Sequence, residues 1–237
     1  MPSYTGRFIM TVAVCVGLIM PLNVTAADAP FLQHVSAEWW QWALSIPTPG
    51  NPLTDGTGEH CMVGQRGATW FLAGVQEGGT VTRTCAVPEG KTLFFPVINF
   101  VNVNTPNVCG QNAENIPVAA LREQIAPFID GATSLSVTVD GKQVQHVHRI
   151  QSKVFAVALP EENVFDASCA RQGLGDVPAG IYAPAVDDGW YVALPPLPVG
   201  HHALLIHAEN LGDPSTSDDD FVLDVTYNLT VVPVLRQ

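Results

Sequence analysis

The segment 221–232 (FVLDVTYNLTVV) has the most regular pattern of apolar and polar positions in the chain. From Phe221 to Val231 every second side chain is apolar or aromatic, and the residues between them are mostly polar. Successive side chains of a strand point to opposite faces, so this period of two predicts a strand with one buried and one solvated face. Apolar runs at 154–159, 189–194 and 202–208 also have the length of strands.

Turn-forming residues divide other apolar runs into hairpins. Between residues 68 and 103, Gly78–Gly79 and Gly90 separate three apolar runs. Asp140–Gly141 lies between 134–139 (SLSVTV) and 142–150 (KQVQHVHRI), which predicts a further hairpin. About nine short strands with regular turns predict a mainly β chain, folded as a single-domain β-sandwich of the jelly-roll or immunoglobulin-like kind.

Two segments have helical periodicity instead. The first is an N-terminal Trp-rich helix predicted over 30–46 and ended by Pro47. Four of its apolar side chains share one face at spacings of four, three and four: Val35, Trp39, Trp42 and Ile46. The second is one short inserted helix predicted over 115–129, with Pro127 at its end.

The N-terminus has the pattern of a secretory signal peptide. An apolar run at 8–22 follows Arg7 and is followed by the small residues Ala26 and Ala27. This run is shorter than the roughly 20 residues that a membrane-spanning helix needs. We therefore predict a signal peptide at 1–26, a single β-sandwich domain at 27–237 with no membrane span, and a secreted or periplasmic location.

Four cysteines remain after the leader is removed: Cys61, Cys85, Cys109 and Cys169. An even number of cysteines in an exported chain predicts two disulfides, which can pair in three ways. We favour neighbour pairing, Cys61 with Cys85 and Cys109 with Cys169, because the first two flank one strand-rich segment. A zinc site is the alternative, although no two cysteines have the short spacing of structural zinc sites.

The charge balance excludes one class of partner. The chain has 10 Lys and Arg against 22 Asp and Glu, a net charge of −12, and its basic residues are scattered. Nucleic acid binding requires clustered basic residues, so nucleic acid is not expected as a partner. The sequence leaves the oligomeric state open.

Histidines supply a candidate metal site. His146 and His148 are two residues apart on a predicted strand, so both side chains should lie on one face. There they could bind Zn²⁺ or Cu²⁺ together, with His202 as a third ligand from another strand. The alternative is a structural role for all three. Asp187 and Asp188 offer oxygen ligands for Ca²⁺, but without the spacing of an EF-hand.

Trp39, Trp40 and Trp42 form a candidate ligand-binding cluster. Indole rings stack on sugars and close over apolar molecules, so a glycan or another small molecule is the expected ligand. Packing in the core is the alternative. Three nearby helical positions cannot all face inward, and we therefore expect Trp40 to lie near the surface or under a loop.

Four motifs together cover most of the chain after the leader: WWQWALSIP (39–47), GQRGATWFLAG (64–74), CAVPEGKTLFFPVIN (85–99) and LPPLPVGHHALLIHA (194–208). They resemble a family of exported bacterial proteins with no assigned activity, which implies an extracytoplasmic location. The run 197–208 also resembles a strand of bacterial immunoglobulin-like domains, a resemblance that implies a structural role for His202.

Two classes of function fit these features. The first is an exported, disulfide-stabilised β-sandwich that acts as a binding or envelope-associated module. The second is a secreted enzyme, metal-dependent or acting on a polysaccharide, that uses the histidine cluster. The enzyme requires His146 and His148 to lie within metal reach of a third side chain in an open cleft.

Overall fold

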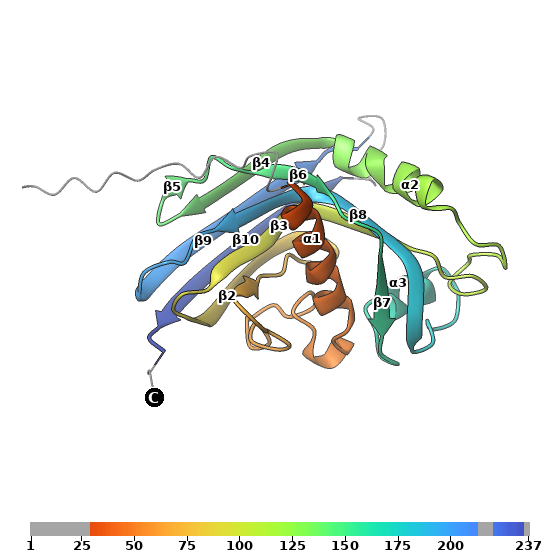
Figure 1. Cartoon of the computed structure of the whole chain (residues 1–237), viewed down its shortest axis with the longest axis horizontal. Helices are drawn as coiled ribbons and strands as arrows, with labels where there is room; N and C mark the ends of the chain where they lie inside the picture. Colours follow the sequence, from red (N-terminus) through yellow and green to blue (C-terminus); the bar gives the residue numbers. More distant parts are fainter. Residues whose placement is uncertain (1–28, 213–219, 235–237) are drawn as a thin grey trace, which may run out of the picture.

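The computed structural model describes residues 29–212 and 220–234, so the predicted signal peptide lies outside the described residues. The helices and strands are arranged in space as Figure 1 shows. In chain order they are α1 Ala29–Leu44, the short 3-10 helix η1 Thr48–Gly50, β1 Thr69–Phe71, β2 Gly79–Pro88, β3 Thr92–Val103, α2 Val118–Asp130, β4 Ala132–Val139, β5 Lys142–Gln143, β6 His148–Gln151, β7 Phe155–Leu159, α3 Asp166–Arg171, β8 Gly180–Leu194, β9 Gly200–Asn210 and β10 Phe221–Val232.

The strands form two sheets that pack face to face. Sheet A has the order β1-β3-β8-β6, with β7 also paired to β8, and sheet B has the order β2-β10-β9-β4-β5. Each sheet contains one parallel pair, β1 with β3 and β2 with β10, and the other pairs are antiparallel. This arrangement confirms the predicted mainly β sandwich.

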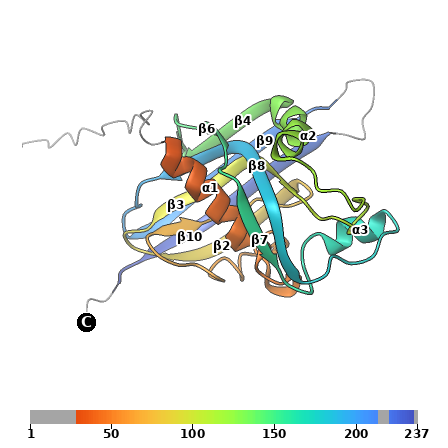
Figure 2. The same ribbon diagram turned by 45° about the vertical axis from the view of Figure 1, so that its right-hand side comes forward.

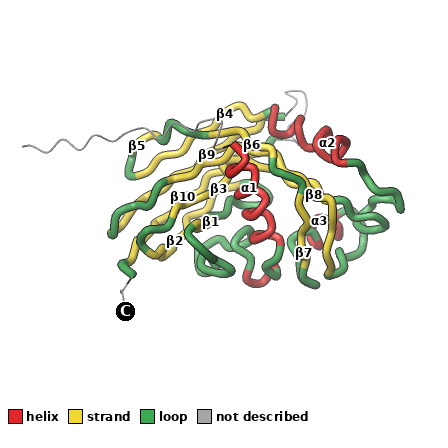
Figure 3. The backbone as a smooth tube through the Cα atoms, viewed as in Figure 1, coloured by secondary structure: helices red, strands yellow, loops and turns green. Residues whose placement is uncertain are grey.

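Helix α1 makes a third layer on the outer face of sheet A (Figure 3). The alternation of side chains along β3 explains why sheet A is buried on both faces. Phe94 packs in the cluster with α1, whereas Leu93 and Phe95 pack in the cluster shared with sheet B. The order of layers is therefore α1, sheet A, sheet B.

The predicted half-buried strand at the C-terminus is confirmed as β10. Leu223, Val225, Tyr227, Leu229 and Val231 are buried, and the residues between them are exposed or half-buried. The buried set packs against sheet A in the core of the sandwich.

Helix α2 differs from its prediction at its C-terminal end. Pro127 lies inside the helix, which continues to Asp130, so the prediction that Pro127 ends it is wrong. A proline inside a helix removes its own N–H donor and the hydrogen bond to the preceding turn, and its ring crowds the carbonyl four residues earlier. Leu121 and Ile125 pack against Val186 of β8, and this packing keeps the helix intact around the missing bond.

The predicted hairpin after Asp140–Gly141 is only partly formed. β5 pairs with β4 over Lys142–Gln143, and then the chain leaves sheet B and enters sheet A as β6. Val144 and Val147 pack between the two sheets during this crossing. The prediction of one strand over all of 142–150 is therefore wrong. The apolar residues Val144 and Val147 lie in the crossover between the two sheets, not on one face of a single sheet.

Two disulfides join loops to regular structure. Cys61 bonds to Cys85 in β2, and Cys109 bonds to Cys169 in α3, so the neighbour pairing is confirmed. The described helices are all too short or too polar to cross a lipid bilayer. Figure 2 shows how β8 extends past the core of the sandwich toward β7 and α3.

Candidate binding site

A cavity of about 420 Å³ lies where α1, α3 and the two sheets meet. Its volume falls in the range of small-molecule sites, about 300–1,000 Å³. Most of the side chains that line it are apolar or aromatic. They come from α1 (Trp39, Trp40, Leu44), from β3 (Pro96–Val101), from α2 (Phe128), from β10 (Phe221, Leu223) and from the residues just before α3 (Val164, Phe165).

Two of the three predicted tryptophans form one wall of this cavity. Trp39 donates its indole N–H to the carbonyl of Leu72 at 2.9 Å, and Trp40 donates to Oδ1 of Asp187 at 2.8 Å. The two rings meet edge to face, with centroids 4.9 Å apart. Because both N–H groups are satisfied inside the protein, the rings present apolar surface at fixed positions to the cavity.

Of the two positions expected for Trp40, near the surface or under a loop, the first is wrong, since all three tryptophans are buried with at most 8% of each exposed. Trp40 faces Asp187 in sheet A, and this polar partner explains how a third indole is buried on the helix. Trp42 lies outside the cavity lining, contacts Phe71 and donates its N–H to the carbonyl of Val63.

Asp187 is the buried acid behind the tryptophan wall. It is fully buried, and its Oδ1 also accepts a hydrogen bond from the Tyr191 hydroxyl at 2.7 Å. Burial raises the pKa of Asp187 to about 8, against the opposing effect of the hydrogen bonds from Tyr191 and Trp40. The carboxyl group therefore holds a proton at neutral pH.

A hydrogen-bonded chain links two walls of the cavity through this acid. Asn99, which lines the cavity, donates from Nδ2 to the Tyr191 hydroxyl at 2.9 Å. Tyr191 and Trp40 both donate to Asp187, so β3, β8 and α1 are joined in one network. The network fixes the ring of Trp40 relative to β3, which keeps the cavity in shape without a ligand.

Asp187 and Asp188 do not form a joint calcium site, because neighbouring residues of β8 point to opposite faces of sheet A. Asp187 faces α1, whereas Asp188 accepts two hydrogen bonds from Arg149, at 3.1 Å from Nε and 2.9 Å from Nη2. The geometry gives each carboxyl group a separate structural partner.

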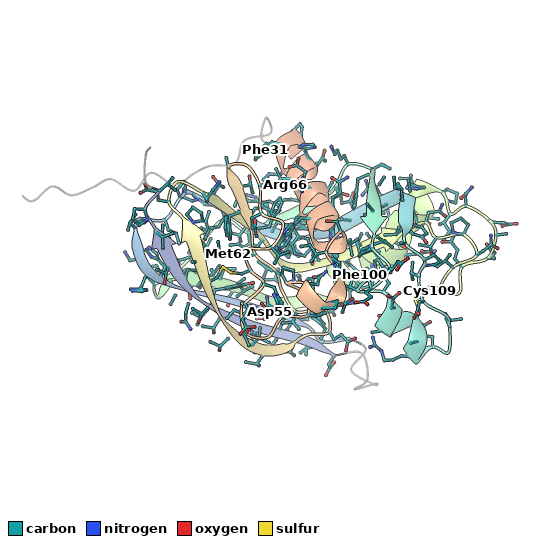
Figure 4. All side chains as sticks on the ribbon, turned by 90° about the horizontal axis from the view of Figure 1, so that it is seen from below. Phe31, Asp55, Met62, Arg66, Phe100 and Cys109 are labelled. Atoms are coloured by element: carbon teal, nitrogen blue, oxygen red, sulfur yellow. A yellow bond between two sulfur atoms is a disulfide. The ribbon has the colours of Figure 1, made fainter. Side chains whose placement is uncertain are left out.

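Aromatic side chains continue from the cavity to the surface. Phe100 contacts Phe128, and Phe128 contacts Phe221, with ring centroids 5.2 Å and 5.6 Å apart. Phe100 is 45% exposed although it lines the cavity. Figure 4 views this side of the molecule, with Phe100 labelled beside α1 and Cys109 next to α3. An exposed aromatic side chain at the mouth is a feature that binding sites share.

A second cavity of about 700 Å³, with more polar residues in its lining, adjoins the first. The two share the lining residues Leu53, Val75, Gln76, Glu77 and Val164. At the mouth of the first cavity, Glu77 forms an ion pair with Arg171 of α3 at 2.6 Å, and both side chains are more than half exposed. The apolar cavity thus has a polar vestibule on the side of Glu77.

The structure places His146 and His148 together, away from the cavity lining. Their rings are parallel, with centroids 6.1 Å apart. His148 lies in β6, where burial and the neighbouring His146 lower its pKa, and its Nε2 is buried without a hydrogen-bond partner among the described residues. The lowered pKa keeps the ring of His148 neutral at pH 7.

His202 does not join this pair. Its Nδ1 contacts Oδ2 of Asp140 and its Nε2 contacts the carbonyl of Pro198, both at 2.8 Å. The hydrogen bond to Asp140 raises the pKa of His202. Within residues 29–212 and 220–234, no three His, Cys, Asp or Glu side chains are grouped closely enough to hold one metal ion. His202, the predicted third metal ligand, thus uses both ring nitrogens in contacts at the start of β9.

Sequence reasoning missed Asn99, Tyr191 and Asp187 as neighbours of the tryptophans. Asp187 carried a signal, since an acidic residue within an apolar strand needs a buried partner. Asn99 and Tyr191 carried none, because only the pairing of β3 with β8 brings them together. No family model, curated protein or solved structure gives a significant match to this chain.

Proposed function

We propose that this protein is an exported binding protein whose ligand is a small molecule with a mainly apolar surface, held in the cavity between α1, β3 and β10. The observation that carries the proposal is the apolar cavity of about 420 Å³, walled by two tryptophans whose N–H groups are satisfied within the protein. A pocket that is mainly apolar with a few polar groups is the common form of a small-molecule site.

The lining favours an apolar ligand over a glycan. A glycan presents many hydroxyl groups, each of which needs a hydrogen-bond partner when it is buried. The cavity offers few polar side chains on its inner surface, with Asn99 next to the tryptophan wall and Gln76, Glu77 and Arg171 near the vestibule. Trp39 and Trp40 are the ligand-contacting members of the tryptophan cluster in this proposal, and Trp42 supports them.

Export is part of the proposal. Disulfides persist in oxidising compartments, and the chain contains two. The leader pattern at 1–26 and the resemblance to exported bacterial proteins agree with a periplasmic or secreted location. The protein would then act as a binding or envelope-associated module in that compartment.

The test is a titration with the fluorescent apolar probe N-phenyl-1-naphthylamine. Binding raises the probe's emission, and Val75→Trp, which places an indole between the two cavities, should weaken binding at least tenfold. Val199→Trp is the matched control, because Val199 is 54% exposed and outside the cavity lining. Equal binding by the wild type and Val75→Trp, or no binding by the wild type, would refute the proposal.

A further inference from the structure

One edge of β3 is open beside the cavity. β1 pairs with β3 only from Thr92 to Phe94, and among the described residues no strand pairs with this edge from Phe95 to Val103. The other edge of β3 is paired with β8 from Leu93 to Val103, interrupted only by a bulge between Pro96 and Ile98. An open edge carries backbone N–H and C=O groups that lack strand partners.

The cavity follows this open edge. Its lining includes every residue from Pro96 to Val101 in sequence. Side chains alternate between the faces of a strand, so a cavity over one face would contact only every second residue. Contact with consecutive residues on both faces shows that the cavity runs along the edge. The bulge between Pro96 and Ile98 lies within this run.

Buried side chains hold the neighbouring segment away from β3. The N–H of Leu72 still donates to the carbonyl of Phe94, but the next residue, Ala73, bonds elsewhere. Ala73 donates its N–H to the Tyr227 hydroxyl at 3.1 Å, and its carbonyl accepts from Tyr227 at 2.8 Å and from Arg83 at 2.6 Å. The chain then passes the far side of the cavity at Gly74–Glu77.

The walls on either side of the edge fit the side chains of an added strand. Trp39 and Trp40 lie on the α1 side of sheet A, and Phe221 and Leu223 lie on the side of sheet B. A strand paired with β3 would direct alternate side chains toward each apolar wall. The edge from Pro96 to Val101 has about the length of an average strand, roughly 17–20 Å.

We propose that the ligand of this cavity is a short extended peptide with apolar side chains, which adds to the open edge of β3 as an extra strand. This inference rests on the proposed function, because it names the ligand class of the same cavity. A purely apolar molecule would leave the edge groups of β3 without partners, whereas a peptide backbone supplies matching donors and acceptors.

The test uses three labelled peptides with identical side chains, based on acetyl-Leu-Val-Leu-Val-Lys-amide. The first is unmethylated, the second is N-methylated at alternate residues, and the third is N-methylated at every residue. The second peptide keeps one edge with free N–H groups, so it should bind with the same affinity as the first peptide and displace N-phenyl-1-naphthylamine. The third has no donor edge, and its affinity should be at least tenfold lower.

Hydrogen exchange locates the peptide on the protein. Backbone amides within Phe95–Val103 that face the open edge should exchange more slowly when the unmethylated peptide is bound, and Val75→Trp should abolish this effect. Equal affinity of the first and third peptides would overturn the inference, as would a dimer formed through this edge that no peptide dissociates. Binding of the naphthylamine probe without any peptide binding would overturn only the inference and leave the proposed function standing.

Discussion

Asp187 shows how a single residue shapes the wall of the cavity. An ionised carboxylate in a fully buried position is costly, and this cost raises the pKa of Asp187 to about 8. In its neutral form the group accepts hydrogen bonds from Trp40 and Tyr191 with one oxygen, and its Oδ2 has no partner among the described residues. The indole of Trp40 is therefore held by a fully buried carboxyl group whose protonation burial favours.

Stability should fall as pH rises because of this acid. Between the ordinary pKa of 3.8 and about 8, the folded protein keeps a proton on Asp187 that the unfolded chain releases. The contribution of Asp187 to the free energy of unfolding is thus fully present below about pH 4 and is lost progressively up to about pH 8. The measurement is urea denaturation of the wild type and of Asp187→Asn at several pH values within this window.

The variant Asp187→Asn separates the pH dependence of stability caused by Asp187 from that caused by other titrating groups. An asparagine accepts the same hydrogen bonds through its side-chain oxygen and does not titrate, so Asp187→Asn should be more stable than the wild type near pH 7 and should depend less on pH. The exposed Asp220→Asn is the control for removing one negative charge, and its pH dependence should match the wild type. If the free energy of unfolding of Asp187→Asn falls with pH as steeply as that of the wild type, Asp187 is not the protonated group that causes the fall.

At the scale of elements, regular alternation was predictable and crossovers were not. The alternation of residues 221–232 identified β10 because its two faces meet different environments. The segment 144–150 gave a wrong prediction because Val144 and Val147 pack, partly buried, between the sheets as the chain passes from β5 to β6. The first half of β8, from Gly180 to Asp188, was missed because it contains Pro184 and two buried aspartates, which are unusual in a central strand.

The connection after β1 is the element that keeps the edge of β3 open. Tyr227→Phe removes the hydroxyl that bonds both the N–H and the carbonyl of Ala73. The buried backbone groups lose a partner, and we expect the free energy of unfolding to fall by roughly 1–3 kcal/mol, measured by urea denaturation. Tyr182→Phe, whose more exposed hydroxyl donates to Pro178, should cost less. Equal losses in the two variants would argue against a special role for Tyr227.

At the scale of the whole molecule, the cavity is a product of the three-layer arrangement. Its lining comes from α1, from β3 and from β10, which are far apart in sequence and meet only when helix, sheet A and sheet B stack. The sequence was sufficient to predict the sandwich, the disulfide pairing and an N-terminal tryptophan helix. It was not sufficient to show that Trp39 and Trp40 share a wall with an open strand edge, because strand pairing determines that edge.

The most direct test of the binding site is a crystal structure of the protein with N-phenyl-1-naphthylamine. We expect electron density for the probe along Pro96–Val101, between Trp40 on one side and Leu223 on the other. Density for the probe only elsewhere on the protein, with this cavity closed by its own side chains, would show that the cavity is not the binding site.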